Sequence, residues 1–211
     1  MSALARVVDA FAQVTAVEWA AVVLALAYLL LAIRQNAWCW ASSIASAVLY
    51  LVVFGRAGLY MQAALQVFYV AMSVYGWRAW RGTDQGAGLP VRRWPVTWHA
   101  LSIAAVVAVT LVNGALVAKS SDASIVPYVD AAIAWGSVFT TLLVARKVLE
   151  NWFYWIVLDV AAAVLYWTQG LYATALLFVL YSVLAWAGYR EWSRDPHPRV
   201  AGDLSRTAGE V

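Results

Sequence analysis

Long stretches without a charged side chain constrain this chain more than any other feature of its sequence. No Asp, Glu, Lys or Arg occurs in residues 35–55, 57–77, 94–118 and 160–189. A helix needs about 20 apolar residues to cross the hydrocarbon core of a bilayer, and each of these runs reaches that length. Because 64% of the 211 residues are hydrophobic and only 12% are charged, the sequence predicts an all-α integral membrane protein.

Seven transmembrane helices are expected from the apolar runs and from the Gly, Pro and charged residues between them. Their expected ranges are 17–33, 38–55, 59–80, 94–117, 127–145, 151–168 and 171–190. The stretch 81–93 is polar and rich in Gly, so it is expected to be a loop. Residues 193–211 carry charges without apolar periodicity, which predicts a disordered tail on the cytoplasmic side.

An internal repeat divides these helices into two halves. Residues 17–80 form the first three-helix repeat and residues 127–192 the second, with a single linker helix at 94–117. The repeat is marked by the pairs Asn36–Asn151, Trp40–Trp155, Tyr50–Tyr166, Tyr60–Tyr172, Tyr69–Tyr181, Gly76–Gly188 and Trp80–Trp192. The offset is 115 for the first two pairs, 116 for the third and 112 for the others.

This order of helices, three, then one, then three, has a consequence for topology. Three helices reverse the direction of the chain and one more restores it, so the two repeats are expected to lie parallel. Transporters of the SWEET type are built from parallel repeats, and repeat transporters bind their substrates near the membrane midplane between the halves. The helix order therefore favours a transporter.

Basic residues indicate how the chain is oriented in the membrane. With the N-terminus outside, the outer side holds only Arg6, Arg56 and Lys119, and the other eleven of the 14 Lys and Arg residues lie inside. The positive-inside rule therefore predicts an external N-terminus and a cytoplasmic C-terminus. Topology also accounts for the net charge of +3, so no nucleic-acid partner is expected.

The segment "LENWFYWIVLD" at residues 149–159 holds the strongest candidates for a substrate site. Trp152, Trp155 and Asp159 are spaced i, i+3 and i+7, which places them on one stripe of a helix. A carboxylate at membrane depth is costly and usually faces a bundle interior or a cavity. Indole faces attract cations and stack on flat rings. A flat cationic substrate fits this stripe, whereas an aromatic belt and a hydrogen-bonded structural acid are the alternatives.

Buried amide and phenol groups complete the expected set of substrate-binding residues. Gln66 lies in the middle of the third helix, with Tyr69 three residues further on the same face. An amide without a partner is costly in lipid, so Gln66 must meet another helix or a ligand. Asn36 and Asn151 open equivalent helices, where helix-start or gating hydrogen bonds are favoured over substrate contact. Tyr166 lies on the same helix as Asp159.

Other chemistries lack support in the sequence. No Gly-rich phosphate loop is present, and His99 and His197 lie too far apart for a metal site to be expected. No nucleophile, base and acid can be combined into a catalytic site. We therefore expect no enzyme, no metal and no cofactor. Glu150 is expected to pair with Arg146 or Lys147.

The chain resembles the PnuC nicotinamide riboside transporters over about residues 17–192. The resemblance rests on "LYMQAALQVFYVAMSVYGWRAW" (59–80), "ARKVLENWFYWIVLDV" (145–160) and "QGLY" (169–172). It implies a SWEET-like bundle in the bacterial inner membrane that imports a vitamin by facilitated diffusion. Phosphorylation by a cytosolic kinase would then trap the substrate without direct contact with the transporter.

The resemblance leaves the substrate open. The wider family includes transporters of nicotinamide riboside, thiamine and riboflavin. Its nicotinamide riboside members have Asn at the position of Asp159 in this chain. Nicotinamide riboside is the expected substrate, with thiamine as the alternative, because both are cations with flat rings. A membrane protein that transports nothing is a further alternative, and the sequence leaves a homo-oligomer open.

Overall fold

The computed structural model describes residues 15–56, 58, 60–81, 89–118, 125–194 and 199–200. Seven helices occur in this described part, and their boundaries fall within three residues of the expected ones: α2 (Ala16–Ile33), α3 (Cys39–Arg56), α4 (Tyr60–Arg81), α5 (Val96–Ala118), α6 (Val126–Ala145), α7 (Asn151–Thr168) and α8 (Tyr172–Trp192). The chain divides into two compact units, Met1–Leu89 and Pro90–Val211. The expected all-α order of three helices, one helix and three helices is confirmed.

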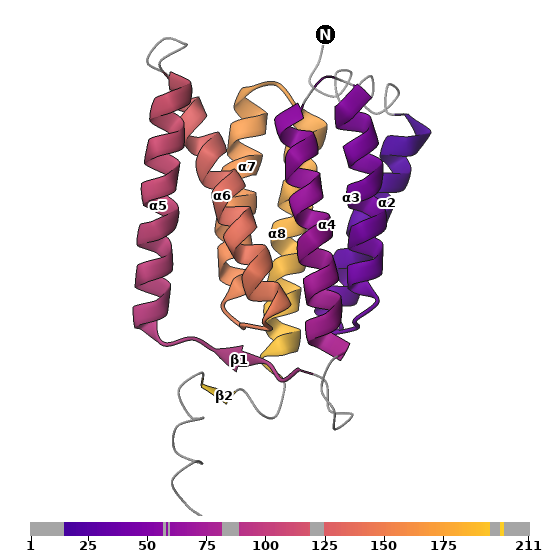
Figure 1. The fold of residues 1–211 in the computed structure, drawn as a ribbon, viewed down its shortest axis with the longest axis vertical. Coiled ribbons are helices and arrows are strands. Elements are labelled where there is room, and N and C mark those ends of the chain that lie inside the picture. Colours follow the sequence, from indigo (N-terminus) through magenta and orange to yellow (C-terminus); the bar gives the residue numbers. More distant parts are fainter. Residues whose placement is uncertain are drawn as a thin grey trace, which may run out of the picture. The chain divides into compact units, whose positions relative to one another are not determined.

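The first unit holds α2, α3 and α4, which pack side by side in sequence order (Figure 1). Small polar residues lie where these helices meet. The hydroxyl of Ser46 in α3 donates to the backbone oxygen of Ala21 in α2 (2.9 Å), and that of Ser73 in α4 donates to Ser43 Oγ (2.8 Å). Small side chains let membrane helices approach closely, and their hydroxyls bond across the contact.

The second unit holds α5, α6, α7 and α8, each packed against the next along the chain. Two short strands lie at one end of it, β1 (Arg92–Arg93) and β2 (Arg199–Val200), and they pair in parallel (Figure 1). The expectation of a tail without structure is therefore wrong for Arg199–Val200, which pair in register with Arg92–Arg93. The other tail residues beyond Arg194 lie outside the described residues, as do residues 82–88 of the expected loop.

The two units repeat the same local backbone at one constant offset of 112 residues. Left-handed residues occur at Gln35 (φ 53°) and Lys147 (φ 51°), and at Gly58 (φ 72°) and Gly170 (φ 78°). The turn between α2 and α3 and the turn between α6 and α7 also share their backbone hydrogen bonds, Asn36 N to Leu31 O in the first and Val148 N to Leu143 O in the second, both 2.9 Å. These bonds satisfy carbonyls at the helix C-terminus.

This constant offset corrects part of the sequence repeat. The pairs at offset 112, such as Gly76–Gly188 and Trp80–Trp192, are confirmed by equivalent surroundings. The pairs Asn36–Asn151, Trp40–Trp155 and Tyr50–Tyr166 are wrong in register, because they match residue types instead of backbone positions. The structural equivalent of Trp40 is Trp152.

A repeated packing motif closes one end of each unit. Trp40 lies edge to face against Trp80, with ring centroids 5.4 Å apart, and Trp152 lies in the same way against Trp192, at 5.2 Å. A Cβ on Gly76 or Gly188 would overlap the ring of Trp40 or Trp152, respectively. Glycine is required at both places because the indole ring lies directly against the helix backbone.

Apolar side chains cover much of the outer surface, as expected for helices in lipid. Three described helices are long and apolar enough to cross a membrane, over the ranges Cys39–Arg56, Val96–Leu116 and Val126–Ala145. Along α5, large side chains such as Leu101, Leu111 and Val112 are more than half exposed. Such a surface is stable in a bilayer and not in water.

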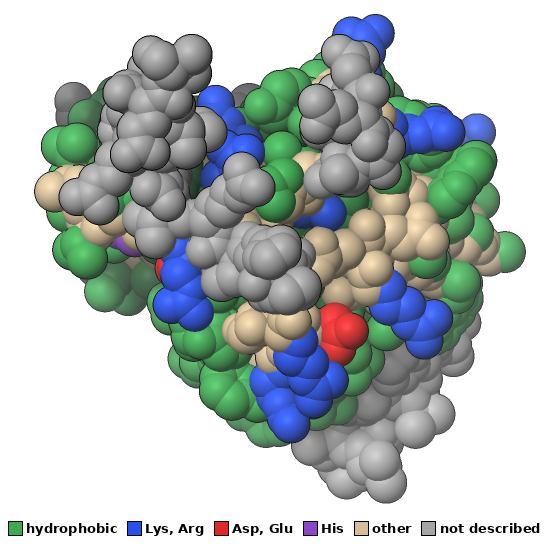
Figure 2. All heavy atoms as spheres, turned by 90° about the horizontal axis from the view of Figure 1, so that it is seen from below, with side chains coloured by type: hydrophobic (Ala, Val, Ile, Leu, Met, Phe, Trp, Pro, Cys, Tyr) green, Lys and Arg blue, Asp and Glu red, His purple; other side chains and the backbone are tan. Residues whose placement is uncertain are grey.

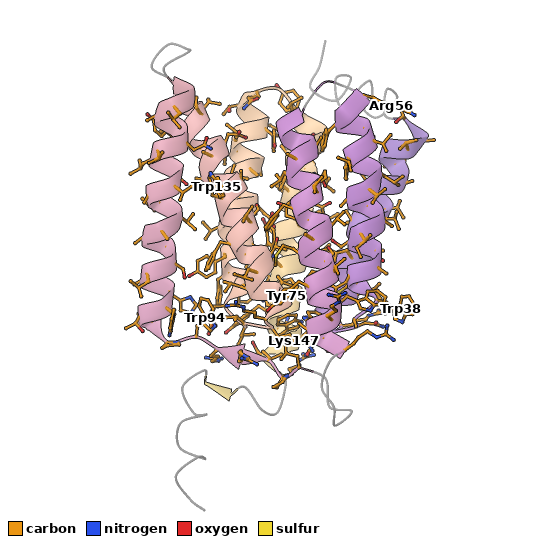
Figure 3. The ribbon with its side chains drawn as sticks, in the orientation of Figure 1. Trp38, Arg56, Tyr75, Trp94, Trp135 and Lys147 are labelled. Atoms are coloured by element: carbon orange, nitrogen blue, oxygen red, sulfur yellow. The ribbon has the colours of Figure 1, made fainter. Side chains whose placement is uncertain are left out.

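Basic side chains gather at one end of each unit. In the first unit, Arg34 and Arg81 lie at the ends of α2 and α4, and in the second unit Arg92, Arg146 and Arg190 lie near β1 or at the ends of α6 and α8. Figure 2, seen from below relative to Figure 1, shows several of the Lys and Arg side chains in blue. Arg56, at the end of α3, lies at the opposite end of the first unit (Figure 3).

Candidate substrate site

The candidate site is built on α7, which begins directly after a tight turn. The turn is possible because Lys147 adopts a left-handed conformation (φ 51°), and α7 then runs from Asn151 to Thr168. Helical geometry places Trp152, Trp155 and Asp159 along one stripe of this helix. The structure nevertheless gives these three side chains different surroundings.

Trp152 is part of the packing between α7 and α8. Only 1% of its surface is exposed, and its ring fills the space beside Gly188 and contacts Trp192. Its indole Nε1 is buried without a hydrogen-bond partner among the described residues. These contacts match the packing alternative for Trp152 and leave little of its ring surface for a ligand.

Trp155 and Asp159 lie one turn apart on α7, and neither side chain has a polar partner among the described residues. Trp155 is half-buried, and no ring contact or hydrogen bond of this side chain occurs within the described part of the chain. Asp159 is only 5% exposed, and its carboxylate has neither a hydrogen bond nor an ion pair with any described residue. One helical turn, a rise of about 6 Å, separates the two residues. An indole face and a buried acid without a partner thus lie next to each other.

Asn151 and Tyr166 lie near the two ends of α7. Asn151 is fully buried, and its side-chain amide donates to the backbone oxygen of Val148 (2.6 Å), which stabilises the turn before α7. Tyr166 is half-buried, stacks on Phe178 in α8 (centroids 5.4 Å apart) and lies in electrostatic range of Asp130. Tyr166 is two helical turns from Asp159, so it lies further along the same side of the helix.

The remaining candidates belong to the first unit. Gln66 in α4 is half-buried, and its amide makes no hydrogen bond to another described residue. Tyr69, one turn further along α4, contacts the ring of Phe68 (5.7 Å) and lies in electrostatic range of Tyr28. Asn36 lies in the turn before α3, where its Oδ1 accepts a hydrogen bond from the backbone N–H of Trp38 (2.9 Å). Such a bond is a local capping interaction.

A cluster around Glu150 was missed by the sequence analysis. The expected ion pair of Glu150 with Arg146 or Lys147 does not form. Glu150 instead accepts a hydrogen bond from the backbone N–H of Trp94 (3.3 Å) and lies 3.8 Å from His99 Nε2. His99 Nδ1 in turn lies 2.9 Å from the hydroxyl of Tyr154. The spacing of Glu150 and Tyr154, i and i+4 on α7, is the signal that indicates a shared partner.

The described residues contain no group of three or more His, Cys, Asp or Glu side chains that could hold a metal ion. Cys39, the single cysteine, is buried at the start of α3. Asp159 therefore has the chemistry of an isolated buried acid, which is able to bind a cation or a hydrogen-bond donor.

A helical membrane bundle with an internal repeat and a buried acid is the architecture expected of a multi-pass membrane transporter. Comparison with known proteins supports this class and gives the family. The sequence model of the family described as nicotinamide mononucleotide transporter matches residues 15–194. The chain belongs to this family, whose members are membrane transporters and not enzymes.

Individual relatives differ in the substrates that their names give. The nicotinamide riboside transporter PnuC of Escherichia coli is 27% identical over 182 residues, which cover 74% of this chain and 76% of that protein. The riboflavin/roseoflavin transporter RibM of Streptomyces davaonensis is 31% identical over 193 residues, or 85% of this chain and 87% of RibM. The crystal structure of the vitamin B3 transporter PnuC superimposes with a TM-score of 0.63, at 21% identity, over 83% of this chain and 79% of that one.

Proposed function

We propose that this protein imports nicotinamide riboside by facilitated diffusion. The observation that carries the proposal is the buried carboxylate of Asp159, which has no hydrogen bond or ion pair with the other described residues. An uncompensated charge at membrane depth is expensive, and a cationic ligand removes that cost by pairing with it. Nicotinamide riboside carries its positive charge on a flat pyridinium ring.

Trp155 supports the same substrate. Its ring is half-buried, lies one turn before Asp159 and has no aromatic partner among the described residues. A pyridinium ring that stacks on this indole gains about 0.5–2 kcal/mol from the cation–π interaction. In this proposal Trp155 provides the stacking surface, Asp159 balances the charge, and Gln66 is a separate candidate for hydrogen bonds with the polar groups of the passing substrate.

Transport requires no ion gradient in this proposal. Phosphorylation by a cytosolic kinase would consume the imported substrate and keep its inward gradient steep. The protein is placed in the plasma membrane with its basic helix ends on the cytoplasmic side, which leaves the N-terminus outside. The clustering of Arg34 and Arg81 in the first unit, and of Arg92, Arg146 and Arg190 in the second, supports this orientation.

Riboflavin is the second candidate substrate. It is favoured by RibM, which is 31% identical to this chain over 193 residues. The isoalloxazine ring of riboflavin is flat and able to stack on Trp155, but it is neutral. Riboflavin binding therefore has no need of a negative charge at Asp159, and this difference separates the two candidates.

A binding panel tests the proposal. Purified protein is titrated with nicotinamide riboside, thiamine and riboflavin, and binding is followed by tryptophan fluorescence and by calorimetry. Saturable binding of nicotinamide riboside, with weaker binding of the other two, is expected. Preference for riboflavin would replace the first candidate by the second, and preference for thiamine would retain the charge argument with another cation. Binding of none of the three would overturn the proposal.

A further inference from the structure

An aromatic and acidic cluster fastens the start of α5 to the start of α7 within the second unit. His99 lies 2.9 Å from the hydroxyl of Tyr154 through its Nδ1 and 3.8 Å from Glu150 through its Nε2. The rings of Trp94 and Phe139 pack around this pair, Trp94 at 5.9 Å from His99 and Phe139 edge to face with Tyr154 at 5.5 Å. Trp94 lies near β1, as Figure 3 shows. We refer to Trp94, His99, Phe139, Glu150 and Tyr154 as the α5–α7 cluster.

The backbone reinforces this attachment. Arg92 in β1 donates its N–H to Lys147 O (2.9 Å) and accepts a hydrogen bond from Leu149 N (2.8 Å). The chain that enters α5 is therefore bonded to the turn that precedes α7. Val91 and Leu149, which flank these bonds, are buried. The side chains of the cluster add a contact further along α7, between His99 and Tyr154.

The first turn of α7 depends on this external contact. The side chain of its N-cap residue, Glu150, makes no capping hydrogen bond to the helix, and the carboxylate instead accepts the N–H of Trp94. Helix starts usually gain stability from a side-chain cap. Here Glu150 and Tyr154 are both contacted from the α5 side, in addition to the packing of Trp152 against α8.

We propose that His99 is a positioning residue for the substrate-binding face of α7 and acts through Tyr154. This inference rests on the proposed function of Trp155 and Asp159. Tyr154 immediately precedes Trp155 in the helix, and the two side chains project about 100° apart around the helix axis. A contact that fixes the Tyr154 side chain therefore also fixes the direction of the Trp155 indole. His99 itself touches no substrate, and its part is to hold the orientation of α7.

Four variants separate this role from general stability. His99→Phe removes both ring nitrogens and keeps the ring, and Tyr154→Phe removes only the hydroxyl and keeps the packing on Phe139. His99→Asn places an amide atom near the position of Nδ1, so it restores the bond to Tyr154. Thr97→Val is the matched control, because Thr97 is exposed on the same turn of α5 and makes no hydrogen bond to another described residue.

Two measurements are made on each purified full-length variant. The first is amide hydrogen exchange in peptides covering residues 149–158, without any ligand. The second is the affinity for nicotinamide riboside, taken together with the maximal uptake rate. His99→Phe and Tyr154→Phe are expected to raise exchange in this segment. They are also expected to weaken affinity roughly two- to twelvefold, which corresponds to a net hydrogen bond of about 0.5–1.5 kcal/mol.

Coupling between the two residues completes the test. The double variant is expected to be no weaker in binding than either single one, since both remove the same interaction. His99→Asn is expected to have the exchange and the affinity of the wild type, because it keeps a bond to Tyr154. Thr97→Val is expected to change neither quantity. His99 does not act through Tyr154 if the losses of affinity in the two single variants add up in the double variant. The same conclusion follows if His99→Asn differs from the wild type in both exchange and affinity.

The two proposals fail in different ways. If the wild type binds none of the vitamins, the proposed function fails, while exchange in residues 149–158 still decides whether His99 positions α7. If the wild type binds nicotinamide riboside and both Phe variants match it in affinity and exchange, the positioning role is overturned and the proposed function stands.

Discussion

Trp152 in α7 lies edge to face against Trp192 in α8, with ring centroids 5.2 Å apart and planes at 87°. Trp40 and Trp80 repeat this relationship in the first unit at 5.4 Å and 84°. In each case the ring also covers a glycine, Gly188 or Gly76. The tryptophan closest to the start of α7 is thus committed to helix packing, and the indole and the acid that follow it have no such partner among the described residues.

Replacing Gly188 with Ala is expected to destabilise the protein by about 1–3 kcal/mol, because the new Cβ would lie 2.5 Å from the Trp152 ring and overpacking has this cost. Thermal unfolding in detergent measures the effect. Gly55→Ala serves as the control, since no atom lies within 4 Å of a Cβ at Gly55. Equal unfolding temperatures for the two variants would contradict the packing described for Trp152.

Trp155→Ala is expected to weaken binding of a cationic vitamin about two- to thirtyfold, from a cation–π contribution of about 0.5–2 kcal/mol. The unfolding temperature should fall less than for a variant of the fully buried Trp152, because Trp155 is half-buried and has no ring partner among the described residues. Trp152→Phe is expected to behave oppositely, with a lower unfolding temperature and nearly unchanged affinity of the folded protein. Titration and thermal unfolding of both variants check this pair of outcomes.

Asp159→Asn keeps the size and hydrogen-bonding ability of the side chain and removes its charge. Affinity for nicotinamide riboside is expected to fall about ten- to hundredfold, since hydrogen bonds to charged groups contribute about 1.5–3 kcal/mol. Affinity for neutral riboflavin is expected to change much less. Calorimetric titration with both vitamins measures the difference, and an equal affinity of variant and wild type for the cation would remove the charge role of Asp159.

Uptake into liposomes is expected to proceed without a sodium or proton gradient and to stop when the substrate concentrations on both sides are equal. Radiolabelled nicotinamide riboside gives the time course. Adding a kinase and ATP inside the liposomes should raise the accumulated label, because phosphorylation removes the free substrate. A strict requirement for an ion gradient would show coupled transport instead of uniport.

The sequence by itself determined the helices of this protein. Charge-free runs of about 20 residues permit little else, because a backbone in lipid must satisfy its hydrogen bonds within each segment. The spacing of Trp152, Trp155 and Asp159 along one helix face was likewise predictable from helical periodicity. The order of three helices, one helix and three helices follows from the same runs.

Only the tertiary structure decided which members of that face are buried by their neighbours. Trp152 and Trp155 are the same residue type on the same helix, but Gly188 and Trp192 enclose the first and not the second. The bond between His99 and Tyr154, 55 residues apart in the chain, also depends on a contact between helices, and the constant offset of 112 was decided by the backbone conformation of the turns. Residue type and spacing within one helix do not identify the packing partner, because it lies on another helix.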